Sequence, residues 1–234
     1  MKKNIKRIIL GLVLVSCIYV AIKEINSKTN EVMEYMPITN KTIVLDAGHG
    51  GADPGSLNKE ETIYEKDVNL AIVLKLRELI ESSGGMVILT REQDDNLYIE
   101  SGDKTRRQKY NESLKNRKQV VVDSKADIFV SIHLNKFEQE KYYGAQTFYP
   151  KGKDESKILS QIIQEELKRV VDETNNREIK PTDDIYMLKD NDIPSILIEC
   201  GFLSNTKEAE LLTNEEYQEK IAWAIYVGIQ RYFS

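Results

Sequence analysis

The sequence predicts a single α/β domain in which a mainly parallel, twisted sheet carries helices on both faces. Short apolar runs alternate along the chain with segments of helical periodicity, the pattern of parallel strands joined by crossover helices. The apolar share of 41% is large enough for a core, and a length of 234 residues suits one domain. No internal repeat or low-complexity segment interrupts the pattern.

The expected elements begin with a strand at 42–46, which ends in a glycine-rich loop. A helix over 65–82 follows because Val68, Ile72 and Leu76 repeat at helical spacing, and Gly84-Gly85 ends it. Further strands are expected at 86–90, 128–133, 144–149 and 195–199, and further helices at 114–124, 154–171 and 215–232. The stretch 92–112 is too charged to bury and has no assigned role.

The N-terminus has the pattern of an export segment. Four basic residues within 1–7 precede the uncharged apolar run 8–22, which is typical of a signal peptide or an uncleaved signal anchor. We expect residues 1–22 to be that segment, 23–40 to be a polar linker, and 41–234 to be the α/β domain. Lipidation of Cys17 is a third possibility. In each case the basic N-terminus places the domain outside the cytoplasmic membrane.

Composition excludes several kinds of site. Two cysteines exclude a disulfide scaffold and a four-thiolate zinc site, and two histidines exclude a three-histidine metal site. The formal charge is −5, and residues 29–234 alone hold 27 basic and 37 acidic side chains, a net of −10. An acidic domain argues against binding to nucleic acid.

His49 lies three residues after the predicted strand 42–46, and His133 is the last residue of the predicted strand 128–133. Both therefore lie at carboxyl ends of strands, where ligands collect in parallel sheets. A lone histidine is more often structural, but two at strand ends, with His49 inside a glycine-rich loop, favour a binding site over chance. That loop lacks the lysine of a phosphate-binding loop. His49 and His133 are therefore candidate metal ligands.

Glu65 is the candidate third ligand. It lies at the start of the helix 65–82 and on its buried stripe, where a carboxylate needs a partner. The alternative is an acid favoured by the helix dipole. Two histidines and one carboxylate with an open fourth position form a typical catalytic site for one Zn²⁺ ion.

Glu199 is the candidate catalytic residue because it ends the apolar strand 195–199. A carboxylate beside a metal site can accept a proton from water and pass it to the leaving group. A structural, hydrogen-bonded acid is the alternative for Glu199. Cys200 as a nucleophile is a further alternative, but no histidine is left to activate it.

Taken together, these residues resemble the zinc-dependent N-acetylmuramoyl-L-alanine amidases with a single α/β catalytic domain. The resemblance covers 42–233 in order and rests on these motifs: VLDAGHGGADPG (44–55), YEKDVNLA (64–71), LTR (89–91), ADIFVSIHLN (126–135), GAQTFY (144–149), NREIK (176–180) and IECGFLSN (198–205). It implies zinc on His49, Glu65 and His133 and catalysis by Glu199. Val121-Val122 stands where the family often has Ala-Asn, and the long polar stretch 92–112 is a second departure; both leave partner or regulatory surfaces open.

Within that family the chain most resembles the spore-cortex subgroup, through GAQTFY, ECGFLSN, the N-terminal anchor and the lack of a wall-binding repeat. The resemblance implies hydrolysis of the amide between the muramic acid lactyl group and L-alanine of peptidoglycan. The product would be converted to muramic δ-lactam with a separate deacetylase, during sporulation and in preparation for germination. The resemblance also implies that the enzyme is exported across the cytoplasmic membrane and is either anchored to its outer face or secreted, in the space around the forespore. A membrane-associated extracytoplasmic protein is the partner that it implies.

Two other functions fit the same residues. One is a different zinc peptidase of peptidoglycan, a carboxypeptidase or endopeptidase. The other is a metal-free, membrane-anchored wall-binding protein.

Overall fold

The computed structural model describes residues 2–95, 97–99, 102 and 104–234. The chain divides into a compact unit over residues 38–233 and a separate N-terminal unit that ends at Pro37. Ile38 is fully buried in the core of the larger unit. The larger unit therefore begins slightly before the expected boundary at residue 41.

The N-terminal unit is one helix, α1 (Lys2–Tyr35). The expected linker 23–40 is thus helical as far as Tyr35. Neither proline nor glycine interrupts the chain between Leu12 and Tyr35, and the helix ends just before Met36-Pro37 because a residue preceding proline disfavours the α conformation. Among the described residues, no helix combines the length and the apolar content needed to cross a membrane.

The larger unit is built on a six-stranded sheet with the order β2-β1-β3-β6-β4-β5. The strands are β1 (Thr42–Ala47), β2 (Met86–Leu89), β3 (Ile128–Asn135), β4 (Gln146–Pro150), β5 (Lys180–Thr182) and β6 (Ser195–Phe202). β4 pairs antiparallel with β6, and the other pairings are parallel. The predicted single α/β domain with a mainly parallel sheet is confirmed.

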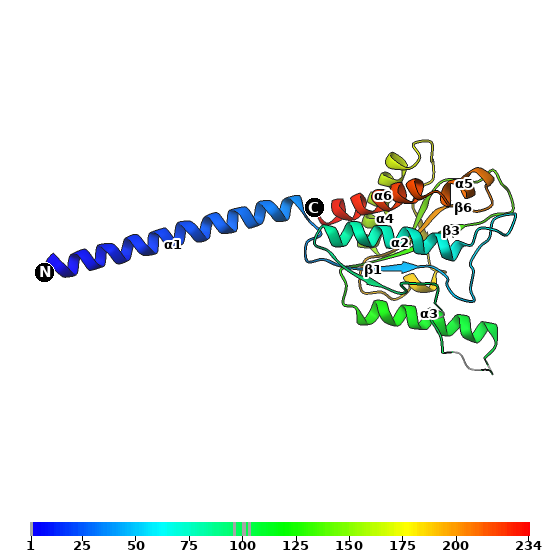
Figure 1. Ribbon diagram of the computed structural model, residues 1–234, viewed down its shortest axis with the longest axis horizontal. Coiled ribbons are helices and arrows are strands. Elements are labelled where there is room, and N and C mark those ends of the chain that lie inside the picture. Colours follow the sequence, from blue (N-terminus) through cyan, green and yellow to red (C-terminus); the bar gives the residue numbers. More distant parts are fainter. Residues whose placement is uncertain (1, 96, 100–101, 103) are drawn as a thin grey trace. The chain divides into compact units, whose positions relative to one another are not determined.

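Helices cover both faces of this sheet (Figure 1). The helices on one face are α2 (Glu65–Ser82), α4 (Asp154–Val170) and α6 (Glu215–Phe233), whose apolar residues share the main core with Leu45, Val130 and Ile198. The opposite face is covered by α3 (Arg106–Asp123) and the short 3-10 helix η1 (Tyr186–Leu188). Val121 of α3 packs there against the strand residues Val44 and Phe129.

Two helices differ from expectation. α3 begins at Arg106 rather than Leu114, inside the polar stretch 92–112. Its start is fixed by a capping box between Thr105 and Gln108, and only Arg117 and Val121 are buried along it, so its sequence has almost no apolar periodicity. The helix α5 (Thr206–Leu212) was not expected; it is short and capped by Asn205.

The topology brings three segments to one edge of the sheet. β1 and β3 are neighbouring parallel strands, so the loop after β1 and the end of β3 lie at the same carboxyl edge. β6 is the other neighbour of β3 and pairs His133 with Glu199. The first turn of α2 closes this edge because the Glu65 backbone N–H donates to the Ser56 carbonyl.

Candidate active site

His49 lies in the loop that follows β1, with a left-handed φ of 65°. A bridge between Gly50 and Asp53 folds this loop back on itself. The loop thereby brings Asp53 Oδ2 to 2.8 Å from His49 Nδ1. Burial lowers the pKa of His49, but its hydrogen bonds to Asp53 and Glu65 outweigh burial and raise it to about 10. Asp53 thus orients the ring so that Nε2 faces the centre of the site.

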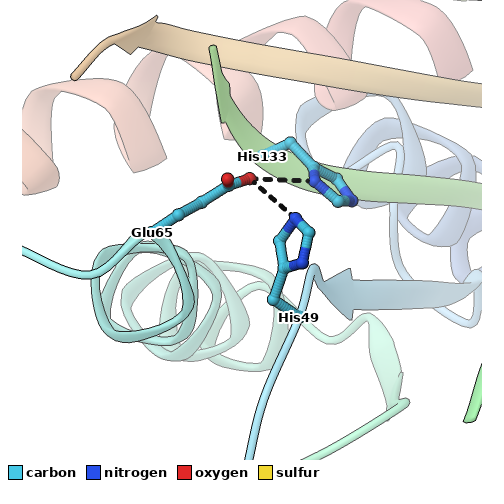
Figure 2. A group of neighbouring side chains, drawn as sticks. All are labelled: His49, Glu65 and His133. Carbon is cyan, nitrogen blue, oxygen red and sulfur yellow. Dashed lines mark hydrogen bonds and ion pairs between the residues drawn. The ribbon is translucent and has the colours of Figure 1, made fainter. Parts of the chain in front are cut away.

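Glu65 is the first residue of α2, and its side chain is 2% exposed. Its Oε1 lies 3.2 Å from His49 Nε2 and 3.0 Å from His133 Nδ1 (Figure 2). The backbone N–H of Ser56 donates to Oε2 at 2.7 Å, and that of Leu134 donates to Oε1 at 3.0 Å. Burial raises the pKa of Glu65, but hydrogen bonds from the two histidines outweigh it and hold this pKa far below its ordinary range.

The three side chains form a group that fits one metal ion. One ligand atom from each of His49, Glu65 and His133 lies within 4.8 Å of the others. The imidazole rings meet edge to face, with centroids 5.0 Å apart. Two ring nitrogens and one carboxylate oxygen are ligands that zinc prefers. A metal bound here would displace the proton that His49 holds, so its binding would release protons.

The backbone approaches the candidate ligands so closely at two positions that only glycine fits there. A Cβ on Gly48 would lie 2.4 Å from His133 Nε2. Gly55 has a φ of +68°, and a Cβ there would lie 2.7 Å from both Glu65 Oε2 and His49 Cδ2. The glycines of this loop therefore let the backbone pack directly against the candidate ligands.

A buried ion pair supports the backbone of the loop that carries His49. Arg117 Nη1 of α3 lies 2.7 Å from Asp46 Oδ1, and both residues are almost fully buried. Arg117 also donates to the carbonyls of Ala47 and His49. Arg91 likewise donates to the carbonyls of Ala47 and Gly48. The backbone that carries His49 is thus held by two guanidinium groups.

This support was not predicted from the sequence. Asp46 stands within an apolar strand, which is a signal that a buried carboxylate needs a partner. The identity of that partner depends on the packing of α3 and is not readable from residue spacing. Ser131 Oγ and Thr90 Oγ1 also donate to Asp46, each at 2.6 Å. Burial raises the pKa of Asp46, but Arg117 and these hydroxyl groups lower it to about 2.

Glu199 lies on β6 directly beside His133 of β3. Its Oε2 is buried and has no hydrogen-bond partner among the described residues. Burial raises the pKa of Glu199 to about 7, with a further rise from Glu65 and an opposing effect from the histidines. A carboxyl group that titrates near neutrality can both accept and donate a proton under physiological conditions.

Cys200 is the neighbour of Glu199 and points into the core with no exposed surface. Burial raises the pKa of its thiol well above the ordinary value. A buried, protonated thiol is a poor nucleophile, which weighs against the cysteine alternative.

A cleft of about 700 Å³ opens onto this site. Its lining includes His49, Asp53 and His133 together with residues of α3 between Arg106 and Arg117. The structure thus gathers the four residues singled out in the sequence, three as one cluster and Glu199 on the adjacent strand.

Comparison with known proteins agrees with this geometry. Residues 43–231 match the family described as N-acetylmuramoyl-L-alanine amidase. The germination-specific N-acetylmuramoyl-L-alanine amidase of Bacillus subtilis is 40% identical over 199 residues, which are 85% of this chain and 82% of that protein. The CwlD amidase of Clostridioides difficile, solved in complex with the GerS lipoprotein, is 75% identical with a TM-score of 0.82. The match covers 82% of this chain and 98% of the CwlD chain. An N-acetylmuramoyl-L-alanine amidase of Clostridium difficile 630 is 34% identical with a TM-score of 0.72, covering 83% and 97%.

Proposed function

The chain belongs to the N-acetylmuramoyl-L-alanine amidase family, and we propose that it hydrolyses its substrate with one Zn²⁺ held by His49, Glu65 and His133 and with Glu199 as the proton carrier. The bond cleaved is the amide between the muramic acid lactyl group and L-alanine of peptidoglycan. The convergence of two ring nitrogens and the Glu65 carboxylate within 4.8 Å carries this proposal.

The residues of the site have separate roles in hydrolysis. When bound, the metal supplies Lewis-acid chemistry toward the amide carbonyl. Asp53 and the backbone N–H groups of Ser56 and Leu134 hold His49 and Glu65 in position for it. Glu199 takes the proton of the attacking water at its carboxylate and returns it to the departing nitrogen of L-alanine. Its Oε2 is buried beside His133 and has no hydrogen-bond partner among the described residues, which leaves that oxygen free to hold the proton.

The products of the reaction test this proposal. The full chain, in detergent and loaded with zinc, is incubated with purified muropeptides, and the released peptides are weighed by mass spectrometry. We expect an intact stem peptide that begins with L-alanine, its loss after chelation, and its return after zinc is added back. A shortened stem would instead identify a carboxypeptidase or endopeptidase. Cleavage that survives both chelation and Glu199→Gln would contradict the proposed site.

We also propose that this amidase acts on the spore cortex, outside the cytoplasmic membrane, where residues 1–22 serve as a signal or an anchor. Support comes from the Bacillus subtilis relative, which is named for germination, and from the CwlD amidase, which was solved with a lipoprotein. The cleaved muramic acid would pass to a separate deacetylase for δ-lactam formation, and a membrane-associated extracytoplasmic protein would be the partner. Spores that lack the protein should contain no muramic δ-lactam when their cortex is digested and analysed by mass spectrometry; a normal lactam content would contradict this role.

A further inference from the structure

The cleft that the candidate metal ligands line also has a strongly basic part. Lys104, Arg106, Arg107 and Lys109 all line it, and we call these four residues the basic wall. They belong to the polar stretch 92–112, to which the amidase reaction assigns no role. Their concentration is unusual because residues 29–234 carry a net charge of −10.

The acidic side chains in the same cleft do not neutralise this wall. Asp46 is paired with Arg117, and Asp53 is paired with His49. Within the basic wall, Lys104 is paired with Glu112, and Lys109 lies over the ring of Tyr98 at 5.2 Å. Arg106 and Arg107 are exposed and have no ion-pair partner among the described residues. Two guanidinium groups are therefore left to face a ligand.

The position of Arg106 on α3 sets its distance from the candidate metal site. Arg106, Tyr110, Ser113 and Arg117 recur at helical spacing and all line the cleft, so they form one stripe of α3. Arg117 contacts the carbonyl of His49. Arg106 lies eleven residues earlier, which is about 16 Å along a helix. An extended peptide covers that distance in about five residues, at roughly 3.3 Å each.

α3 also runs in the right direction for this purpose. It connects β2 to β3, which both run parallel to β1, so its N-terminus lies at the carboxyl edge of the sheet where the site is (Figure 1). A peptide that extends from the reacting amide along the α3 stripe would reach the basic wall.

We propose that Arg106 and Arg107 are specificity-determining residues that bind free carboxylates of the stem peptide beyond the scissile amide, so that the enzyme prefers anionic stems to amidated ones. This inference rests on the proposed function. Guanidinium groups match carboxylates in shape and charge, whereas a carboxamide offers them no charge. Two solvent-exposed ion pairs of this kind change affinity by roughly tenfold.

The test compares two muropeptides that differ only in whether their stem carboxylates are free or converted to carboxamides. The full chain in detergent is compared with Arg106→Gln/Arg107→Gln, and with Lys115→Gln as a control on an exposed residue of α3 that does not line the cleft. We expect the double variant to lose roughly tenfold in kcat/KM on the anionic muropeptide, through KM, and less than twofold on the amidated one. The control should keep the wild-type preference, and added salt should weaken that preference.

Binding of the two released stem peptides, measured by calorimetry, provides a readout that does not need catalysis. We expect tighter binding of the anionic peptide to the wild type and equal binding of both peptides to the double variant. Equal losses on both ligands, or no loss on the anionic ligand, would overturn the inference. If the wild type cleaves neither muropeptide, the proposed function fails, while the calorimetric comparison still decides whether the basic wall binds carboxylates.

Discussion

Replacing Arg117 by leucine tests the link between the fold and the candidate site. The side chain of Arg117 is 4% exposed, and its Nη1 lies 2.7 Å from Asp46 Oδ1. Leucine would leave the buried Asp46 carboxylate without its ion-pair partner, although Ser131 and Thr90 would still donate to it. The carbonyl of His49 would also lose the hydrogen bond that it accepts from Arg117.

The expected cost follows from these contacts. Breaking a buried ion pair by removing one partner costs about 3–5 kcal/mol, and the lost donor at His49 places this case at the upper end. The pKa of Asp46 is about 2, below its ordinary 3.8, so ionisation of this group contributes about 2 kcal/mol of stability above pH 4. That contribution disappears as the pH falls through 2. The loss caused by Arg117→Leu should therefore be large at pH 7 and smaller at pH 3.

Urea unfolding followed by circular dichroism measures the free energy of unfolding, and competition with a chelator measures zinc affinity. We expect Arg117→Leu to lose about 4–5 kcal/mol at pH 7 and to bind zinc more weakly, whereas Lys115→Gln on the same helix stays within about 0.5 kcal/mol of the wild type. Asp46→Asn/Arg117→Leu should cost less than the sum of its single variants because no buried charge is left alone. A free energy of unfolding unchanged by Arg117→Leu, or strict additivity in the double variant, would refute this reasoning.

Three further predictions concern the site itself. Glu199→Gln should lower kcat by at least about 100-fold while the zinc content measured by atomic absorption stays unchanged, because it removes the proton carrier and no ligand; retained kcat would contradict this. In metal-free protein the pKa of Glu199 is about 7 against an ordinary 4.5, so its ionisation costs about 3 kcal/mol above pH 7 and nothing below pH 4. Glu199→Gln should therefore stabilise the metal-free protein against urea at pH 8 but not at pH 4, and an equal change at both would count against the buried charge. Gly55→Ala should weaken zinc binding in a chelator competition by at least roughly tenfold because its Cβ would meet Glu65 and His49. Gly152→Ala, at a similar φ of +78° but in open space, is the matched control and should leave zinc affinity unchanged.

The parts of the fold that could be predicted from the sequence are those with a local pattern. The helix 65–82 was placed at its observed bounds because its apolar stripe is regular and Gly84-Gly85 follows it. The same stripe placed Glu65 on the buried side, and the strand ends placed His49, His133 and Glu199 at one edge of the sheet. Each of these inferences needs only residue spacing and the general properties of parallel sheets.

The rest depends on contacts between distant segments. β5 is three residues long and exists because it pairs with β4, and α3 buries too few apolar side chains to show a period. The pairing of Asp46 with Arg117 joins residues 71 positions apart. Asp53 orients His49 only because the Gly50–Asp53 bridge closes the loop. No pattern within a short window contains this information.

The helix α3 contributes both to the core and to the site. Its Val121 packs against one face of the sheet, and its Arg117 donates a hydrogen bond to the His49 carbonyl. A transient opening of this helix would expose Phe129 and remove the Arg117 contacts of the loop in a single event, leaving only Arg91 to hold the backbone. Local stability of α3 and support of the His49 loop are therefore coupled. Amide hydrogen exchange along α3 would measure the free energy of this local opening.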